Sequence, residues 1–290
     1  MDYRTIISIE DLHKALAEPE LVIFDCRHEL MNPDAGARAY AESHIPGARF
    51  AHSEKNLAGQ KTGRNGRHPL PEPQAFMQWL GASGVDSHKQ VVAYDFAAGS
   101  SAARLWWMLR WVGHERVAVL DGGWDAWAKA GLPVTSDVPR IAPTTFAGSA
   151  RSNWVDVKFV QERLNDPSVV VVDARAPERF KGLTEPIDPV AGHIPGARNR
   201  LYKENLDADG RFKSPQELRA AFVALLAGVP PDRAVHQCGS GVSACTNLLA
   251  MEIAGMPGAR LYPGSWSEWV ADPTRPVATG PGATSPGATS

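Results

Sequence analysis

Residues 21–27, LVIFDCR, and residues 169–175, VVVVDAR, are two copies of one short pattern, an apolar run that ends in Asp-x-Arg. The motif HIPGAR follows each copy, at residues 44–49 and 193–198, at nearly the same spacing. A pattern that occurs twice in the same order indicates a duplicated chain. We therefore expect two domains that share one fold.

Each half of the chain alternates short apolar runs with segments of helical periodicity. The runs QVVAYD at residues 90–95 and RAVHQ at residues 233–237 each precede such a segment, AARLWWMLRWVG at residues 102–113 and ACTNLLAMEIAG at residues 244–255. Apolar strands separated by helices are typical of a parallel sheet that is covered on both sides. We predict an α/β fold in which each domain is a mostly parallel sheet flanked by helices on both faces.

Composition changes mark the domain boundaries. Residues 137–152, DVPRIAPTTFAGSARS, combine prolines with small polar residues and lack helical periodicity, which is typical of a linker. The chain closes in GPGATSPGATS, a low-complexity segment that favours a flexible tail. We predict an N-terminal domain at residues 1–136, a C-terminal domain at residues 153–278 and a tail at residues 279–290.

Charge and composition exclude several classes of protein. The 290 residues carry a formal net charge of −2, and acidic and basic residues alternate without a basic face, so we expect no nucleic-acid partner. The chain has no apolar run long enough to span a membrane and does not begin with a signal-peptide pattern, so we expect a cytoplasmic protein without a membrane partner. Its three cysteines, Cys26, Cys238 and Cys245, match neither a disulfide framework nor a metal-binding pair.

The two halves differ where a strand meets the helix that follows it. In the second half this turn consists of Cys238, Gly239, Ser240, Gly241, Val242, Ser243 and Ala244. A thiol at this place faces backbone N–H groups and a helix N-terminus, which stabilise a thiolate or a persulfide anion. The first half has Asp95 in the cysteine position, so the duplicated fold carries one thiol site. The alternative is that Cys238 is a small buried residue at the start of a helix.

Residues present in both halves are expected to have a structural role. His44 and His193 occupy identical HIPGAR contexts, and Asp25 and Asp173 end corresponding strands, although only one half has the thiol. Cys26 follows a buried strand and is predicted to be inert.

The motif CGSGVSA, with the paired HIPGAR segments and the turns DGGW and PGSW, resembles the two-domain rhodanese family, and its loop is most similar to that of the 3-mercaptopyruvate sulfurtransferases. The resemblance extends from about residue 5 to about residue 275 and implies a silent N-terminal domain and no cofactor. Thiosulfate-preferring relatives usually carry cations after the cysteine, as in CRKGVTA. Gly239 and Ser240 stand there in this chain, which favours mercaptopyruvate as the donor.

The resemblance also implies roles for residues outside the loop. Arg179 matches the family's substrate-binding arginine. The alternative role for this residue is a surface ion pair. Ile187 stands where a second arginine is expected. Ser240 and His68 match two members of a serine-protease-like triad, and Glu54 stands where its aspartate is usual. The loop residues Gly239, Gly241, Val242, Ser243 and Ala244 are expected to line the substrate site.

The expected reaction moves sulfur from 3-mercaptopyruvate through a Cys238 persulfide to cyanide or to a thiol, such as thioredoxin or a low-molecular-weight thiol, and releases pyruvate. Two alternatives stay open, a thiosulfate:cyanide sulfurtransferase and a non-catalytic persulfide carrier. A cysteine phosphatase needs arginine six residues after its cysteine. Ala244 stands at that position here, so the sequence argues against a phosphatase.

Overall fold

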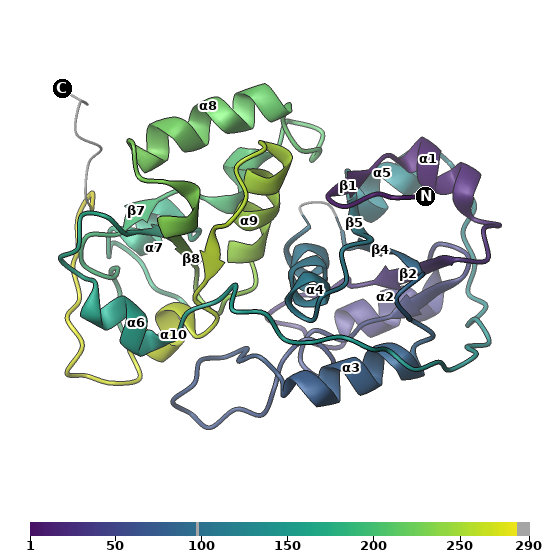
Figure 1. Cartoon of the computed structure of the whole chain (residues 1–290), viewed down its shortest axis with the longest axis horizontal. Helices are drawn as coiled ribbons and strands as arrows, with labels where there is room; N and C mark the ends of the chain where they lie inside the picture. Colours follow the sequence, from purple (N-terminus) through teal and green to yellow (C-terminus); the bar gives the residue numbers. More distant parts are fainter. Residues whose placement is uncertain (97–98, 283–290) are drawn as a thin grey trace. The chain divides into compact units, whose positions relative to one another are not determined.

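The computed structural model describes residues 1–96 and 99–282 (Figure 1). Packing divides the chain into two compact units. Unit 1 contains Met1–Gly59, Leu70–Arg151 and Leu206–Phe212, and unit 2 contains Gln60–Pro69, Ser152–Asn205 and the chain from Lys213 onward. Two short segments cross over: residues 60–69 pack in unit 2, and residues 206–212 pack in unit 1. The units therefore do not consist of two uninterrupted stretches of chain. Of the expected tail, residues 283–290 lie outside the described residues.

Unit 1 is built around a sheet of five strands, all paired in parallel, in the order β1-β5-β4-β2-β3. The strands are β1 (Ile6–Ile7), β2 (Leu21–Asp25), β3 (Ala48–Phe50), β4 (Gln90–Tyr94) and β5 (Val117–Leu120). The helices that flank the sheet are α1 (Ile9–Ala15), α2 (Ala35–Glu42), α3 (Pro73–Ala82), α4 (Ser100–Trp111) and α5 (Gly123–Lys129) (Figure 1).

Unit 2 repeats this arrangement around a parallel sheet in the order β7-β6-β8-β9. The strands are β6 (Val170–Asp173), β7 (Arg198–Asn199), β8 (Ala234–Gln237) and β9 (Arg260–Leu261). The α-helices are α6 (Val157–Glu162), α7 (Pro177–Phe180), α8 (Pro215–Leu226), α9 (Ala244–Ile253) and α10 (Ser265–Trp269), and two 3₁₀ helices are η1 (Tyr202–Asn205) and η2 (Pro231–Arg233). In place of the first strand, Trp154 makes a single parallel bridge to Leu261.

The predicted α/β fold with parallel sheets is confirmed, and burial explains it. Every residue of β4 is buried, and so are all four residues of β8, which requires a layer on each face of the sheet. The helix α4 that follows β4 is buried along nearly its whole length. Among the described residues no helix is both long and apolar enough to cross a membrane.

The duplicated Asp-x-Arg pattern forms the same buried ion pair in both units. Arg27 binds both carboxylate oxygens of Asp25 at 2.7–3.1 Å and donates to the Ser43 carbonyl at 2.6 Å. Arg175 does the same with Asp173, at 2.6–3.1 Å, and with the Gly192 carbonyl at 2.7 Å. Each pair therefore ties the end of a central strand to the start of the HIPGAR loop.

The two HIPGAR histidines also make corresponding contacts. The Nδ1 atom of His44 lies 2.7 Å from the Tyr40 carbonyl oxygen, and that of His193 lies 2.8 Å from the Phe180 carbonyl oxygen. Burial lowers the pKa of His193, although its Phe180 contact opposes the shift. These contacts fit the structural role that the duplication predicts.

Candidate active site

Cys238 is the first residue after β8, at the carboxyl end of the sheet in unit 2. Its side chain is almost fully buried, at 2% exposure. Its N–H donates to the Ser265 hydroxyl at 3.1 Å, and its carbonyl accepts from the Trp266 N–H at 3.0 Å. The start of α10 thus fixes the backbone of the cysteine on both sides.

The loop after Cys238 curls back over the sulfur. Gly241 has φ of +77° and directs its N–H at the Cys238 Sγ, 3.1 Å away. A side chain at Gly241 would collide with the backbone of Pro263, so this conformation needs glycine for space as well as for φ. Helix α9 starts three residues later. The sulfur therefore lies beside a donating N–H group and close in sequence to a helix N-terminus, a setting that stabilises an anion.

Unit 1 shows what the equivalent turn binds. Asp25 pairs with Tyr94, and Asp173 pairs with Gln237, so the residues that follow, Asp95 and Cys238, occupy the same register position in their sheets. The Asp95 carboxylate accepts hydrogen bonds from three N–H groups near the start of α4, at 2.8–3.2 Å. The turn in unit 1 thus binds a carboxylate where unit 2 has the sulfur.

Burial dominates the electrostatics of Asp95. It raises the pKa of this carboxyl to about 6, although the N–H groups of Ala102, Gly99 and Ser101 oppose the shift. A buried anion is costly even with three donors.

Ser240 and His68 meet inside unit 2. The Ser240 Oγ lies 2.8 Å from the Nδ1 of His68, and both side chains are buried. The tautomer of the imidazole decides which of the two donates. The segment 60–69 that carries His68 is held where Gly66 packs on Gly264 and where the Arg67 N–H donates to the Ser267 hydroxyl at 3.0 Å. The predicted Ser–His pair is therefore within hydrogen-bond distance.

Arg179 lies in the short helix α7 and forms buried ion pairs. Its Nε contacts both carboxylate oxygens of Glu185 at 3.1 Å, and its Nη2 lies 2.6 Å from Glu185 and 3.2 Å from Asp188. Both acidic side chains are only 3% exposed, so the alternative of a surface ion pair does not describe this arginine. The side chain reaches the cysteine loop, because a Cβ at Gly239 would lie 3.6 Å from Arg179 Nη2.

The two acids that bind Arg179 differ in their electrostatics. Burial opposes ionisation of Glu185, but the Arg179 guanidinium and the N–H groups of Asp188 and Ile187 outweigh it and lower the pKa of Glu185. For Asp188 burial prevails over Arg67, and its pKa is raised. Asp188 is therefore the less stabilised carboxylate of the two.

Arg67 is a residue of the site that the sequence analysis missed. Its guanidinium pairs with Asp188, and a Cβ at Gly239 would lie 2.8 Å from its Nη2. The cysteine loop has no cation of its own, yet a guanidinium stands directly beside Gly239. The available signal was the position of Arg67 next to His68 in NGRHPLP.

The remaining predicted residues are placed as follows. Val242 and Ser243 are half-buried and lead into α9, which begins with the buried Ala244. Glu54 belongs to unit 1, where its N–H donates to His52 Nδ1 at 3.2 Å. Its role toward His68 of unit 2 stays a prediction.

The two other thiols are fully buried. Burial, followed by the nearby Asp95 and Asp25 carboxylates, raises the pKa of Cys26 well above its ordinary value. The Cys245 thiol donates to the Gly241 carbonyl at 3.4 Å and so supports the loop that surrounds Cys238. These surroundings disfavour a thiolate at Cys26.

A model of the rhodanese-like domain matches the chain twice, at residues 8–130 and 156–272. A Pseudomonas aeruginosa protein called "Probable 3-mercaptopyruvate sulfurtransferase" is 47% identical over 97% of this chain and 100% of its own length. The human 3-mercaptopyruvate sulfurtransferase and the Bos taurus thiosulfate sulfurtransferase are each 34% identical over 92% of this chain and 92% of their own lengths. Identity to these two mammalian proteins therefore does not discriminate between the two donors.

Two solved structures are similar to most of this chain. The 3-mercaptopyruvate sulfurtransferase of Leishmania major has a TM-score of 0.82 and 31% identity over 94% of this chain and 75% of its own. SseA of Escherichia coli, described as a 3-mercaptopyruvate sulfotransferase, has a TM-score of 0.76 and 31% identity over 91% of this chain and 99% of its own.

Proposed function

The chain belongs to the rhodanese-like family, and on that premise we propose that it is a sulfurtransferase that takes sulfur from 3-mercaptopyruvate, holds it as a persulfide on Cys238 and passes it to a thiol or cyanide. The observation that carries the proposal is the contact between the Gly241 N–H and the Cys238 Sγ at 3.1 Å. A donor aimed at the sulfur, close to the start of a helix, suits a nucleophile that is anionic before and after it receives sulfur.

The reaction proceeds in two transfers. The Cys238 thiolate attacks the sulfur of the donor, a new S–S bond forms, and the C–S bond breaks with its electron pair moving to carbon. The resulting enolate takes up a proton and leaves as pyruvate. In the second transfer an acceptor thiolate attacks the outer sulfur, and the S–S bond electrons return to Cys238.

Ser240 and His68 are proposed to supply the proton for the enolate. Their contact at 2.8 Å forms a path from the imidazole to the hydroxyl of the cysteine loop. Arg179 is proposed to bind the donor carboxylate, since its guanidinium reaches the loop at Gly239. Glu54 is proposed to orient His68, and Val242, Ser243 and Ala244 to line the donor site together with the loop glycines.

Unit 1 is proposed to be catalytically silent. Asp95 occupies the cysteine position, and its carboxylate takes up the N–H groups near the start of α4. For the linear chain we propose a silent domain at residues 1–136, a linker at residues 137–152 and a catalytic domain at residues 153–278. We further propose a cytoplasmic location and thioredoxin or a small thiol as the acceptor.

Thiosulfate is the second candidate donor, and one observation favours it. The sequence of the cysteine loop contains no cation, which argues against binding of the thiosulfate dianion. In the folded chain, however, the Arg67 guanidinium occupies the space beside Gly239. A cation supplied by another segment can serve an anionic donor as well as one within the loop.

Steady-state sulfur transfer to cyanide and to a dithiol tests the proposal, with kcat/KM compared for 3-mercaptopyruvate and thiosulfate. We expect a preference for mercaptopyruvate that disappears in Cys238→Ser and survives in Cys26→Ser, the matched control of a buried thiol in unit 1. A preference for thiosulfate would replace the donor. Absence of turnover with either donor, while Cys238 still reacts with alkylating agents, would point to a persulfide carrier.

A further inference from the structure

The Arg67 guanidinium is the outermost member of a row of alternating charges in unit 2. Asp173 pairs with Arg175, and Arg175 pairs in turn with Glu185 at 3.3 Å. The row continues from Glu185 to Arg179, and through Asp188 to Arg67. Three cations and three anions thus connect the end of β6 to the segment 60–69.

The last acid of the row bridges two guanidinium groups. One carboxylate oxygen of Asp188 contacts Arg67 Nη1, and the other lies 3.2 Å from Arg179 Nη2. Both arginines also reach Gly239, the residue next to Cys238, with Arg67 the closer of the two. The carboxylate of Asp188 therefore sits between the two cations that border the cysteine loop, as an anionic donor would.

We propose that Arg67 is a specificity-determining residue that binds the anionic group of the sulfur donor, and that Asp188 is an internal carboxylate which competes for the same guanidinium. The sulfur donor in this statement rests on the proposed function; the effect of Arg67 on anions that approach Cys238 does not.

Three observations favour this role over a purely structural ion pair. The Arg67 side chain keeps 25% exposure, whereas Asp188 is 3% exposed, so the cation is accessible at one side. Gly239 has no side chain, which leaves the space next to Cys238 open to Arg67 Nη2. The Nε of Arg67 is buried without a hydrogen-bond partner among the residues described, so the guanidinium retains an unused donor.

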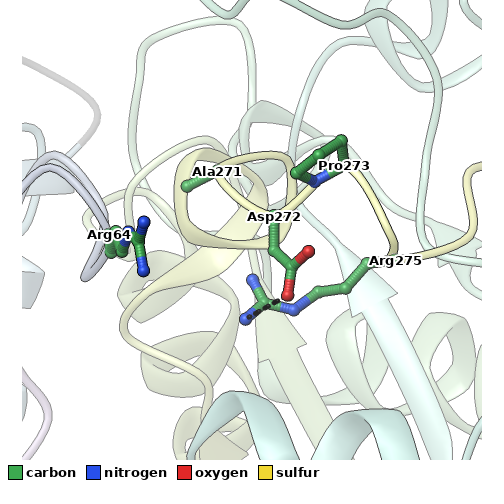
Figure 2. A pocket seen from close by; sticks show the side chains of 5 residues that line it. All are labelled: Arg64, Ala271, Asp272, Pro273 and Arg275. Atoms are coloured by element: carbon green, nitrogen blue, oxygen red, sulfur yellow. Dashed lines mark ion pairs between the residues drawn. The ribbon is translucent and has the colours of Figure 1, made fainter.

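Arg64 provides a matched control on the same segment. It lines a separate pocket of about 250 Å³ with Ala271, Asp272, Pro273 and Arg275, where Asp272 pairs with Arg275 at 3.7 Å (Figure 2). Removing its charge changes the net charge of the protein as much as removing that of Arg67. Comparing the Arg64 and Arg67 variants therefore separates the effect of where the cation lies from the effect of losing one positive charge.

The first test uses two alkylating agents of similar size. Iodoacetate is an anion and iodoacetamide is neutral, and the ratio of their rates at Cys238 cancels changes in the thiolate fraction. The modified peptide is identified by mass spectrometry. We expect the ratio to fall at least about threefold in Arg67→Gln, to rise in Asp188→Asn, and to stay at the wild-type value in Arg67→Lys and Arg64→Gln.

The second test measures transfer with the native donors. In Arg67→Gln we expect KM for thiosulfate and for 3-mercaptopyruvate to rise about tenfold while kcat changes less than about twofold, and in Asp188→Asn we expect KM to fall. The alkylation result is interpretable without turnover, so a failure of the proposed reaction leaves it intact.

An unchanged alkylation ratio in Arg67→Gln, or equal falls in Arg67→Gln and Arg64→Gln, would overturn the proposal. If Arg67→Gln fails to fold, the Asp188→Asn arm still decides, because the proposal requires an increase in that variant.

Discussion

The Ser240 hydroxyl and the His68 imidazole lie 2.8 Å apart although 172 positions separate them in the chain. The contact exists because the segment 60–69 leaves the half of the chain in which it is encoded and packs within unit 2. A hydroxyl and an imidazole at this distance can exchange a proton.

Removing either partner is expected to slow the protonation of the pyruvate enolate. We predict that Ser240→Ala and His68→Gln each lower kcat for 3-mercaptopyruvate about 100-fold and that the double variant loses little more. His88→Gln, which removes an exposed imidazole from unit 1, is the control. Fully additive losses in the double variant would contradict a shared proton path.

The loop around the sulfur is expected to depend on the absence of a side chain at Gly241. Gly241→Ala places a Cβ against the Pro263 backbone at φ of +77°, so we predict a loss of about 2–4 kcal/mol in the free energy of unfolding of unit 2 and loss of sulfur transfer. Chemical denaturation and the transfer assay measure the two effects.

Gly228→Ala separates steric conflict from backbone strain. Gly228 has φ of +89° in the same unit, and a Cβ there meets no atom within 4 Å. We expect this variant to lose only about 1 kcal/mol and to keep full transfer activity. Equal losses in the two variants would show that the space around Gly241 is not decisive.

Sequence patterns predicted the fold because the duplication is visible in short stretches of sequence, each of which forms one strand, turn or helix. Asp25 and Asp173 each end an apolar run. Each run is a strand that pairs in parallel with a neighbouring strand of its own sheet, as expected. The same reasoning located Cys238 and paired Ser240 with His68, the latter through the family resemblance. Cys238 lies in a short motif that is readable without knowledge of the packing, whereas the Ser240–His68 contact also depends on the placement of the segment 60–69 in unit 2.

Long-range packing explains what the sequence did not predict. The contact of Arg67 with Gly239 requires the segment 60–69 to join unit 2, and, unlike His68 in the same segment, Arg67 was not among the residues matched through the resemblance. Glu185 and Asp188 follow the helix of Arg179 as ordinary loop acids, and only their burial identifies them as its partners. Charge at a site is thus set by residues that come together in space.

Asp95 is predicted to stabilise unit 1 without contributing to catalysis. Its carboxylate accepts three backbone N–H groups, so Asp95→Ala leaves these donors without an acceptor and is expected to cost about 1–3 kcal/mol in the free energy of unfolding. Asp125→Ala, which removes an exposed acid from the first turn of α5, is the matched control. A large loss of sulfur transfer in a folded Asp95→Ala protein would contradict the silent role of unit 1.

His236 predicts a loss of stability in acid. Burial, followed by Arg200, lowers the pKa of this imidazole to about 3, and its Nε2 lies 3.1 Å from the Met251 sulfur. Below pH 6.5 the unfolded chain takes up a proton that folded His236 does not bind until about pH 3, so unit 2 loses stability as the pH falls through this window, by a total on the order of 5 kcal/mol.

The variant His236→Leu removes this titration and fills much of the same space. We expect the free energy of unfolding, measured in urea between pH 7 and pH 4.5, to fall less steeply in His236→Leu than in the wild type, whereas His88→Leu at an exposed position retains the wild-type slope. A slope that is equally steep in both variants would show that acid lability arises elsewhere, because a histidine kept neutral by burial couples folding to proton release in this range.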